Sequence, residues 1–279
     1  MIKRFVFQPP GPLPSVDLMR RCSLMSVVKE ADADIYYIHI KCPSTSVINA
    51  PKGELFTILY HHGNAEDLGT CYESLVFLSR VVGVDIIVYD YCGYGFSKAR
   101  GRSAPREKSV YKDADAMYTE LTERLHISPH HIILMGRSMG GGPACYLAQK
   151  HHSSIGGLIL LSTFTSCLGA VRCSFLRYLF VKDMFPNKKF LKKVDDCPIL
   201  ILHGTKDDVV SFSCAKKLLK IVEKSHRIRN KGANVHHYWF DGCKHNDIEC
   251  KSGIKLINVI SLFTSYVSSY SSTREPIAQ

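Results

Sequence analysis

Short runs of apolar residues recur along this chain, and most of them end at a glycine or a polar residue. Runs of this length, closed in this way, are typical of strands that are buried on both faces of a sheet. We therefore predict strands over residues 35–40, 55–60, 84–91, 131–135, 158–161, 199–202 and 235–240.

Between these runs, apolar residues recur at spacings of three and four, which is the pattern of a helix with one buried face. The predicted helices cover residues 67–82, 109–125, 139–149, 212–222 and 254–266. The regular alternation of strands and helices predicts an α/β protein with a mostly parallel central sheet and helices on both faces.

This alternation continues almost to the end of the 279 residues, so we predict a single domain over residues 21–267. Residues 1–20 form a Pro-rich lead-in, because a sequence such as QPPGPLP at 8–14 fits neither a helix nor a central strand. Residues 268–279 form a Ser-rich tail that we expect to fray. Within the domain, residues 162–197 form a short insertion after a predicted strand.

The chain is basic, with 36 Lys and Arg against 25 Asp and Glu and a formal charge of +11. We interpret the basic clusters either as solvated helix faces or as a surface in weak contact with an acidic membrane. Nucleic acid is not expected as a partner, because no aromatic–basic interleaving or binding motif accompanies the charge. The clusters contain Lys182, Lys188, Lys189, Lys192 and Lys193, and then Lys216, Lys217, Lys220, Lys224, Arg227, Arg229 and Lys231.

Eleven cysteines are spread along the chain without the spacing of a disulfide framework. No secretory signal opens the sequence, and no apolar run approaches the roughly 20 residues of a spanning helix. We therefore expect reduced thiols and a cytoplasmic protein. Cys92 and Cys243 fall in loops near the site described next, and the sequence assigns no role to either thiol.

The sequence GRSMG at residues 136–140 matches the G-x-S-x-G pattern of a nucleophile elbow. It follows a predicted strand and precedes a helix that begins with small residues, which is the context that this motif requires. A sharp turn of this kind holds a serine above the sheet, at the positive end of the following helix. Ser138 is therefore the candidate nucleophile.

A serine hydroxyl needs a base to take its proton, and the base needs an acid to orient it. Where this elbow occurs, the acid and the histidine follow the serine in the chain. His245 lies in the loop after the last predicted strand and is the candidate base. His203 precedes the candidate acids, so we interpret it as a supporting or structural residue. Asp207 and Asp208 are the candidate acids.

The other histidines occur as pairs at residues 61–62, 130–131, 151–152 and 236–237. We interpret them as mostly strand-edge or surface residues. None has metal-ligand spacing with carboxylates or cysteines, so we expect no metal and no cofactor.

Acyl transfer also needs N–H donors for the developing oxyanion. One donor is expected to be the backbone amide of Met139, next to the nucleophile. The second is expected from the loop after the strand at 55–60, where Asn64 is the first candidate and Ala65 the alternative. The same loop can also begin a helix with Asp67 as its N-cap.

Five motifs occur in an order that resembles the α/β-hydrolase domain-containing protein 17 family. They are YHHGNAED at 60–67, DYCGYGFS at 90–97, GRSMGGGPA at 136–144, HGTKD at 203–207 and HNDIE at 245–249. The resemblance implies the α/β-hydrolase fold and a catalytic triad of Ser138, Asp207 and His245, which favours Asp207 over Asp208. It also implies a membrane-associated enzyme that removes palmitate from protein cysteines by thioester hydrolysis.

That family carries an N-terminal cluster of palmitoylated cysteines, whereas here Cys22 stands alone. We therefore expect a protein that is either unattached or held weakly, through its basic clusters, on the cytosolic face of a membrane.

The expected substrates are an acylated protein or a small acyl ester. A general carboxylesterase, a lipase or a peptidase of the same fold is the alternative, and a catalytically silent scaffold is the non-enzymatic one. The insertion at 162–197 is expected to be a short lid whose apolar residues either pack a small helix or form a lip for an acyl chain. They are Phe164, Leu168, Phe175, Leu176, Tyr178, Leu179, Phe180, Met184 and Phe185.

Overall fold

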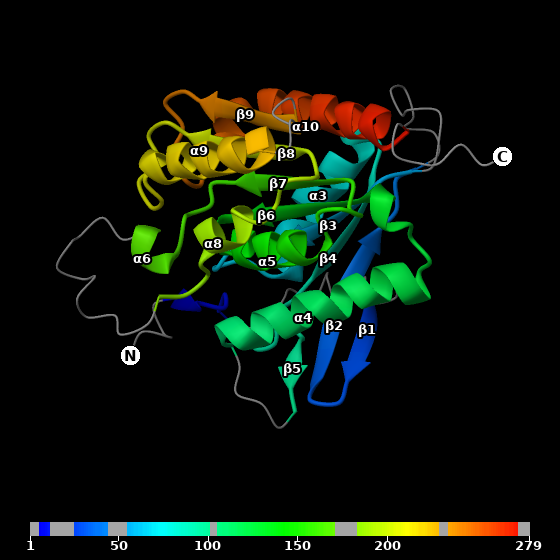
Figure 1. Ribbon diagram of the computed structural model, residues 1–279. Helices are drawn as coiled ribbons and strands as arrows, with labels where there is room; N and C mark the ends of the chain where they lie inside the picture. Colours follow the sequence, from blue (N-terminus) through cyan, green and yellow to red (C-terminus); the bar gives the residue numbers. More distant parts are fainter. Residues whose placement is uncertain are drawn as a thin grey trace.

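The computed structural model describes residues 6–11, 25–43, 55–100, 105–170, 183–228 and 234–272. Within these ranges the strands form one nine-stranded sheet (Figure 1). They are β1 Met25–Glu30, β2 Ala33–Ile40, β3 Thr57–His61, β4 Asp85–Tyr89, β5 Lys98–Ala99, β6 Ile132–Arg137, β7 Gly157–Leu161, β8 Ile199–Gly204 and β9 Val235–Phe240.

The strand order is β1-β2-β4-β3-β6-β7-β8-β9, with the short β5 paired to β2. All pairs from β4 to β9 are parallel, and only the pairs that involve β1 and β2 are antiparallel. The carboxyl ends of six strands therefore meet at one edge of the sheet, which is where open parallel sheets place their ligand sites.

The described helices follow the strands as the apolar spacing predicts. The main ones are α3 Leu68–Val82, α4 Glu107–Thr119, α5 Gly141–His151, α6 Cys167–Ala170, α8 Asn187–Leu191, α9 Phe212–Ile228 and α10 Ile248–Ser272. Short turns η3 Glu120–Arg124, η4 Pro129–His131 and η5 Ser138–Gly140 extend or precede them. The predicted N-cap at Asp67 is confirmed, since its side chain accepts from the Thr70 backbone while the Thr70 side chain bonds back to Asp67.

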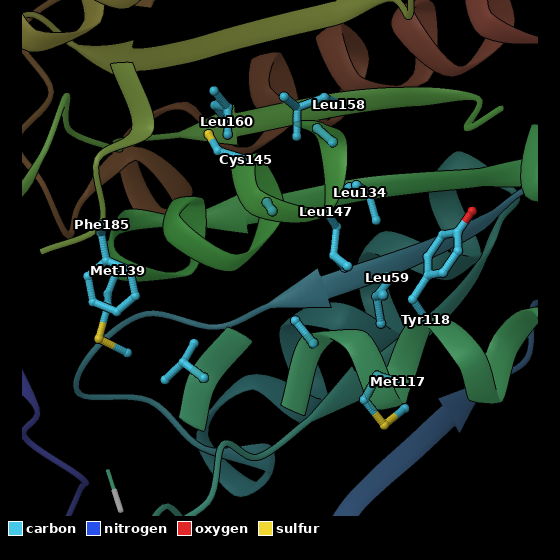
Figure 2. Packing of buried hydrophobic residues seen from close by; sticks show 14 of the residues in the cluster. Leu59, Met117, Tyr118, Leu134, Met139, Cys145, Leu147, Leu158, Leu160 and Phe185 are labelled. Carbon is cyan, nitrogen blue, oxygen red and sulfur yellow. The ribbon is translucent and has the colours of Figure 1, made fainter. Parts of the chain in front are cut away.

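Each face of the sheet carries its own buried core. Alternate strand residues point to opposite faces, so Leu59, Leu134 and Leu158 pack with α4, α5, α8 and α9, while their neighbours pack with α3 and α10. Figure 2 shows part of the first core, with Leu134 and Leu158 of adjacent strands beside Leu147 of α5. The predicted mostly parallel sheet with helices on both faces is confirmed.

The differences from the sequence prediction lie at the edges. The strands β1 and β5 were not predicted, because β1 is a half-exposed edge strand of mixed polarity and β5 has only two residues. Helix α10 begins six residues earlier than predicted and continues to Ser272, five residues into the segment predicted as a tail. No helix in the described ranges is both long enough and apolar enough to cross a bilayer.

Candidate active site

The predicted nucleophile lies on a strained turn between β6 and α5. Ser138 has a φ of 50°, a conformation that non-glycine residues rarely adopt. The two motif glycines permit this turn, because a Cβ at Gly136 would collide with the Gly140 carbonyl and a Cβ at Gly140 with the His61 carbonyl. The Thr163 hydroxyl, from the loop after β7, donates to the Ser138 carbonyl oxygen at 2.7 Å. The elbow is therefore braced from both neighbouring strands.

Two loops at the same edge of the sheet bring a histidine and an aspartate to Ser138. The His245 Nε2 atom lies 3.0 Å from the Ser138 hydroxyl, and the His245 Nδ1 atom lies 2.8 Å from Asp207 Oδ2. His245 is 107 positions from Ser138 and 38 positions from Asp207 in the chain, so the fold is what brings the three residues together. The arrangement lets the imidazole accept the serine proton while the carboxylate holds the ring.

The Asp207 carboxylate is buried and surrounded by donors. Its Oδ1 atom accepts the backbone N–H groups of Val209 and Val210, at 2.9 and 2.7 Å. Its Oδ2 atom faces His203 Nε2 at 3.2 Å in addition to His245. Burial alone would raise the pKa of Asp207, but hydrogen bonds from the two histidines and from the backbone outweigh burial and hold this pKa well below its ordinary value.

The structure separates the two candidate acids. Asp208 is half exposed and its carboxylate lies 3.6 Å from the Lys244 ammonium group, whereas Asp207 contacts His245. His203, the rival base, is fully buried, and its Nε2 atom lies 3.2 Å from the Asp207 Oδ2 atom and 3.0 Å from the Val210 carbonyl oxygen. It therefore supports the acid and does not contact the serine hydroxyl.

The expected oxyanion donors come from adjoining strands. Met139 lies in the first turn after β6, where backbone N–H groups have no earlier carbonyl to bind. The loop of Asn64 follows β3, which pairs with β6 at His61 and Gly136. The Asn64 side-chain oxygen accepts from the Gln8 N–H and the Tyr94 hydroxyl, so its side chain is already committed. Donation by the backbone amides of Met139 and Asn64 stays a prediction.

These residues line a pocket of about 580 Å³, within the usual range for small-molecule sites. The apolar part of the lining consists of Val6, Phe164, Leu168, Met184, Val209 and Val210. The polar part includes Glu66, Arg137 and Asn246, with Arg137 in contact with the other two. Ser138 and His245 line the same pocket, so a bound molecule can reach the candidate nucleophile and base.

The predicted lid contributes part of the apolar lining of the pocket. Phe164, Leu168 and Met184 line the pocket, as an apolar lip would require. Phe185 does not line it, because its ring is fully buried in the core against Tyr111. The other apolar residues of the predicted lip, Phe175, Leu176, Tyr178, Leu179 and Phe180, lie outside the described residues.

Participation of the Pro-rich lead-in in the site was not predicted from the sequence. Val6 and Gln8 nevertheless line the pocket, and Phe7 is buried with its ring edge-on to Phe185 at 6.0 Å. The only available signal was the short apolar run Phe5-Val6-Phe7 just ahead of the prolines.

The first histidine pair lies at the end of β3, as the strand-edge interpretation expects, but it is not at the surface. His61 and His62 are fully buried. The His61 Nδ1 atom lies 2.8 Å from the Tyr89 hydroxyl, and burial lowers the pKa of His61 to about 3. Both imidazoles are therefore kept neutral as core residues.

Two other groups of residues named from the sequence lie away from the pocket or remain untested. Cys92 and Cys243 are buried in the two cores and do not line the pocket. The described lysines of the basic clusters are exposed on α8, directly after α8 and on α9, which fits solvated helix faces. Weak contact with an acidic membrane stays a prediction.

Comparison with known proteins supports the fold and the family resemblance. A family model described as "alpha/beta hydrolase fold" matches residues 57–178. Alpha/beta hydrolase domain-containing protein 17B of Xenopus laevis is 36% identical over 196 residues, which cover 70% of this chain and 62% of that protein. The human protein 17B is 35% identical over 196 residues, which again cover 70% of this chain and 62% of that protein. The chain thus matches less than two thirds of the length of these relatives.

Solved structures show the same fold at low sequence identity. An esterase from Rhodococcus sp. ECU1013 superposes with a TM-score of 0.64 at 18% identity, covering 88% of this chain and 99% of that one. A monoacylglycerol lipase from Paleococcus ferrophilus gives 0.60 at 17% identity, covering 84% and 98%. The predicted α/β-hydrolase fold is confirmed.

Proposed function

This chain belongs to the α/β-hydrolase domain-containing protein 17 family, and from that premise we propose that it is a serine hydrolase of acyl thioesters that acts on palmitoylated proteins. The observation that supports this proposal most strongly is the contact of His245 with both the Ser138 hydroxyl, at 3.0 Å, and the Asp207 carboxylate, at 2.8 Å. A hydroxyl on a strained elbow, next to an oriented imidazole, is the arrangement that activates a serine nucleophile.

The proposed reaction has two steps. First, His245 Nε2 takes the Ser138 proton as Oγ attacks the thioester carbonyl, and the oxyanion binds the N–H groups of Met139 and Asn64. The C–S bond then breaks, and His245 protonates the departing thiolate. Second, His245 takes a proton from water, which attacks the acyl-enzyme, and Ser138 regains its proton as the fatty acid leaves.

The apolar lining residues offer a place for the acyl chain. We place that chain near Phe164, Leu168 and Met184, because burial of methylene groups is favourable there. The cysteine part of the thioester then points away from these residues. An ester with a short acyl chain would cover fewer of them and would gain less from burial.

Hydrolysis of a palmitoyl-thioester peptide, measured beside a short-chain p-nitrophenyl ester, tests the proposal with wild type and Ser138→Ala. We expect turnover of the long thioester by the wild type and loss of at least a thousandfold in the variant. Turnover of the short ester alone would assign a general esterase. No turnover of either substrate would contradict the proposal and leave the catalytically silent scaffold as the better account.

A further inference from the structure

The residue that precedes the nucleophile carries a guanidinium group bound to three other segments. Arg137 Nη1 donates to Glu66 Oε1 at 2.7 Å, and Nη2 donates to Asn246 Oδ1 at 3.1 Å. Its Nε atom lies 3.4 Å from Glu249 Oε1, in the first turn of α10. The side chain is only 12% exposed, although it lines the pocket beside Ser138.

Each contact leads to a group that the proposed reaction uses. Glu66 Oε2 also accepts the backbone N–H of Gly63, and Gly63 is bonded to Asn64, an expected oxyanion donor. Asn246 follows His245 directly in the chain. A single side chain, fixed to the elbow through its own backbone, thus joins the loop of the oxyanion donor to the loop of the base.

The packing around this junction is tight. A Cβ on Gly63 would lie 2.9 Å from Glu66 Oε2 and 3.1 Å from Arg137 Nη1, so the two charged groups lie directly against the Gly63 backbone. Burial would lower the pKa of Arg137, but Glu66 and Glu249 outweigh it and keep the group charged. Removing Arg137 would leave the Glu66 and Glu249 carboxylates without their shared cation and would remove the hydrogen bond to Asn246 in the His245 loop.

We propose that Arg137 is a positioning residue, whose contacts with Glu66 and Asn246 hold the Asn64 loop and the His245 loop in register with Ser138. This inference rests on the proposed serine-hydrolase function and adds a residue to it. The planar guanidinium suits the role because its donors point in fixed directions toward several acceptors, which a lysine ammonium cannot match.

The test is the rate at which a fluorophosphonate probe labels Ser138, because this reaction needs the activated serine and the oxyanion donors but not the natural substrate. We expect the probe to label Ser138 about 10- to 100-fold more slowly in Arg137→Met than in wild type, because misplacing reacting groups by about 1 Å lowers a rate by about that factor. Arg137→Lys restores the charge without the geometry and is expected to fall between the two. Glu66→Gln removes one partner and is expected to slow labelling less than Arg137→Met.

Arg124→Met is the matched control. Arg124 is 70% exposed and pairs with Glu120 on its own helix, away from the pocket, so its loss is expected to change labelling by less than twofold. Circular dichroism and thermal melting identify folded variants, and only the folded fraction is compared. In steady-state assays with a substrate that turns over, a positioning role lowers kcat while KM stays within about threefold.

Wild-type labelling rates in folded Arg137→Met and Arg137→Lys would overturn the inference. Labelling of Ser138 without turnover of the palmitoyl thioester would overturn only the proposed substrate, and the rates of the Arg137 variants would still decide the inference. If wild-type Ser138 were not labelled at all, there would be no activated serine to position, and both proposals would fall.

Discussion

Asp90 and Asp207 are both buried at the edge of the sheet where the parallel strands end, yet their carboxyl groups differ in charge. Asp207 has two histidines and two backbone N–H groups around it, and its pKa is held well below the ordinary value. Asp90 accepts from the Leu68 and Phe96 N–H groups at 2.9 and 3.3 Å, and the His62 Nε2 atom lies 3.8 Å away. Burial raises the pKa of Asp90 to about 7.

Low solvent exposure alone therefore does not decide the charge of a carboxyl group. Asp90 lies deeper in the protein than Asp207, and it has two backbone donors where Asp207 has two backbone donors and two histidines. Both differences raise the pKa of Asp90 relative to that of Asp207, because deeper burial penalises the ionised form and each donor offsets part of that cost. Asp207 is consequently ionised and able to orient an imidazole. Asp90 is about half protonated near neutral pH and acts as an acceptor that fastens the start of α3.

The largest expected effect comes from removing the negative charge of Asp207. Asp207→Asn should lower kcat about 10³- to 10⁴-fold, because the amide cannot hold His245 in the required tautomer and orientation. Asp208→Asn is the neighbouring control and should stay within twofold, since Asp208 is half exposed and pairs with Lys244. The measurement is kcat on active-site-titrated enzyme, and equal losses in the two variants would contradict the assignment of Asp207.

A smaller effect is expected from Asp90, which should change how the free energy of unfolding depends on pH. Its pKa is higher in the folded protein than in the unfolded chain, so between about pH 4 and 7 the folded state binds more protons. Its contribution to the free energy of unfolding therefore falls as pH rises through that range. Asp90→Asn removes this dependence, and its stability relative to wild type should improve by about 2 to 4 kcal/mol from pH 4 to 7.

Urea unfolding of wild type and Asp90→Asn at several pH values measures that difference. Taking the difference separates Asp90 from groups whose effect on stability changes with pH in the opposite direction, such as His61, whose pKa is lowered to about 3. Asp208→Asn should show no such trend. If the stability difference between Asp90→Asn and wild type stayed constant from pH 4 to 7, the pKa of this carboxyl group would not be raised in the folded protein.

The smallest effect is expected at His203, which supports Asp207 without contacting Ser138. His203→Leu should lower kcat about tenfold, because one hydrogen bond to a buried carboxylate is lost while His245 and the backbone donors remain. The loss should disappear in an Asp207→Asn background, which a double-mutant cycle measures. Equal losses in both backgrounds would indicate that His203 acts only on the core.

The sequence predicted what depends on local pattern. The strands β3, β4 and β6 to β8 are buried on both faces and appear as apolar runs, and the elbow at Ser138 is encoded within five consecutive residues. The edge strand β9 was also predicted, although only one of its six residues is buried. The choice of His245 followed from its order in the chain, and the structure places it against Ser138 and Asp207.

Features that depend on distant contacts could not be predicted in this way. Arg137 reads as the variable position of a motif until the fold brings Glu66 and Asn246 to it, from 71 and 109 residues away. From the sequence, His61 resembles a polar residue at the end of a strand, but the neighbouring parallel strands bury it completely, so its side chain does not contact solvent. The edge strand β1 has neither a continuous apolar run nor a strict alternation, since only one of its six residues is buried.

The seating of Phe7 and Gln8 has a practical consequence for anyone who labels or immobilises this protein. Val6 forms part of the pocket wall, so the chain enters the described structure at the rim of the site, whereas α10 ends at the other end of the molecule (Figure 1). An affinity tag, dye or surface linker fused just ahead of Val6 would lie next to the pocket and would crowd the protein substrate that we propose. Fusions after α10 lie away from the pocket, and they are the ones to use when activity on large and small substrates is compared.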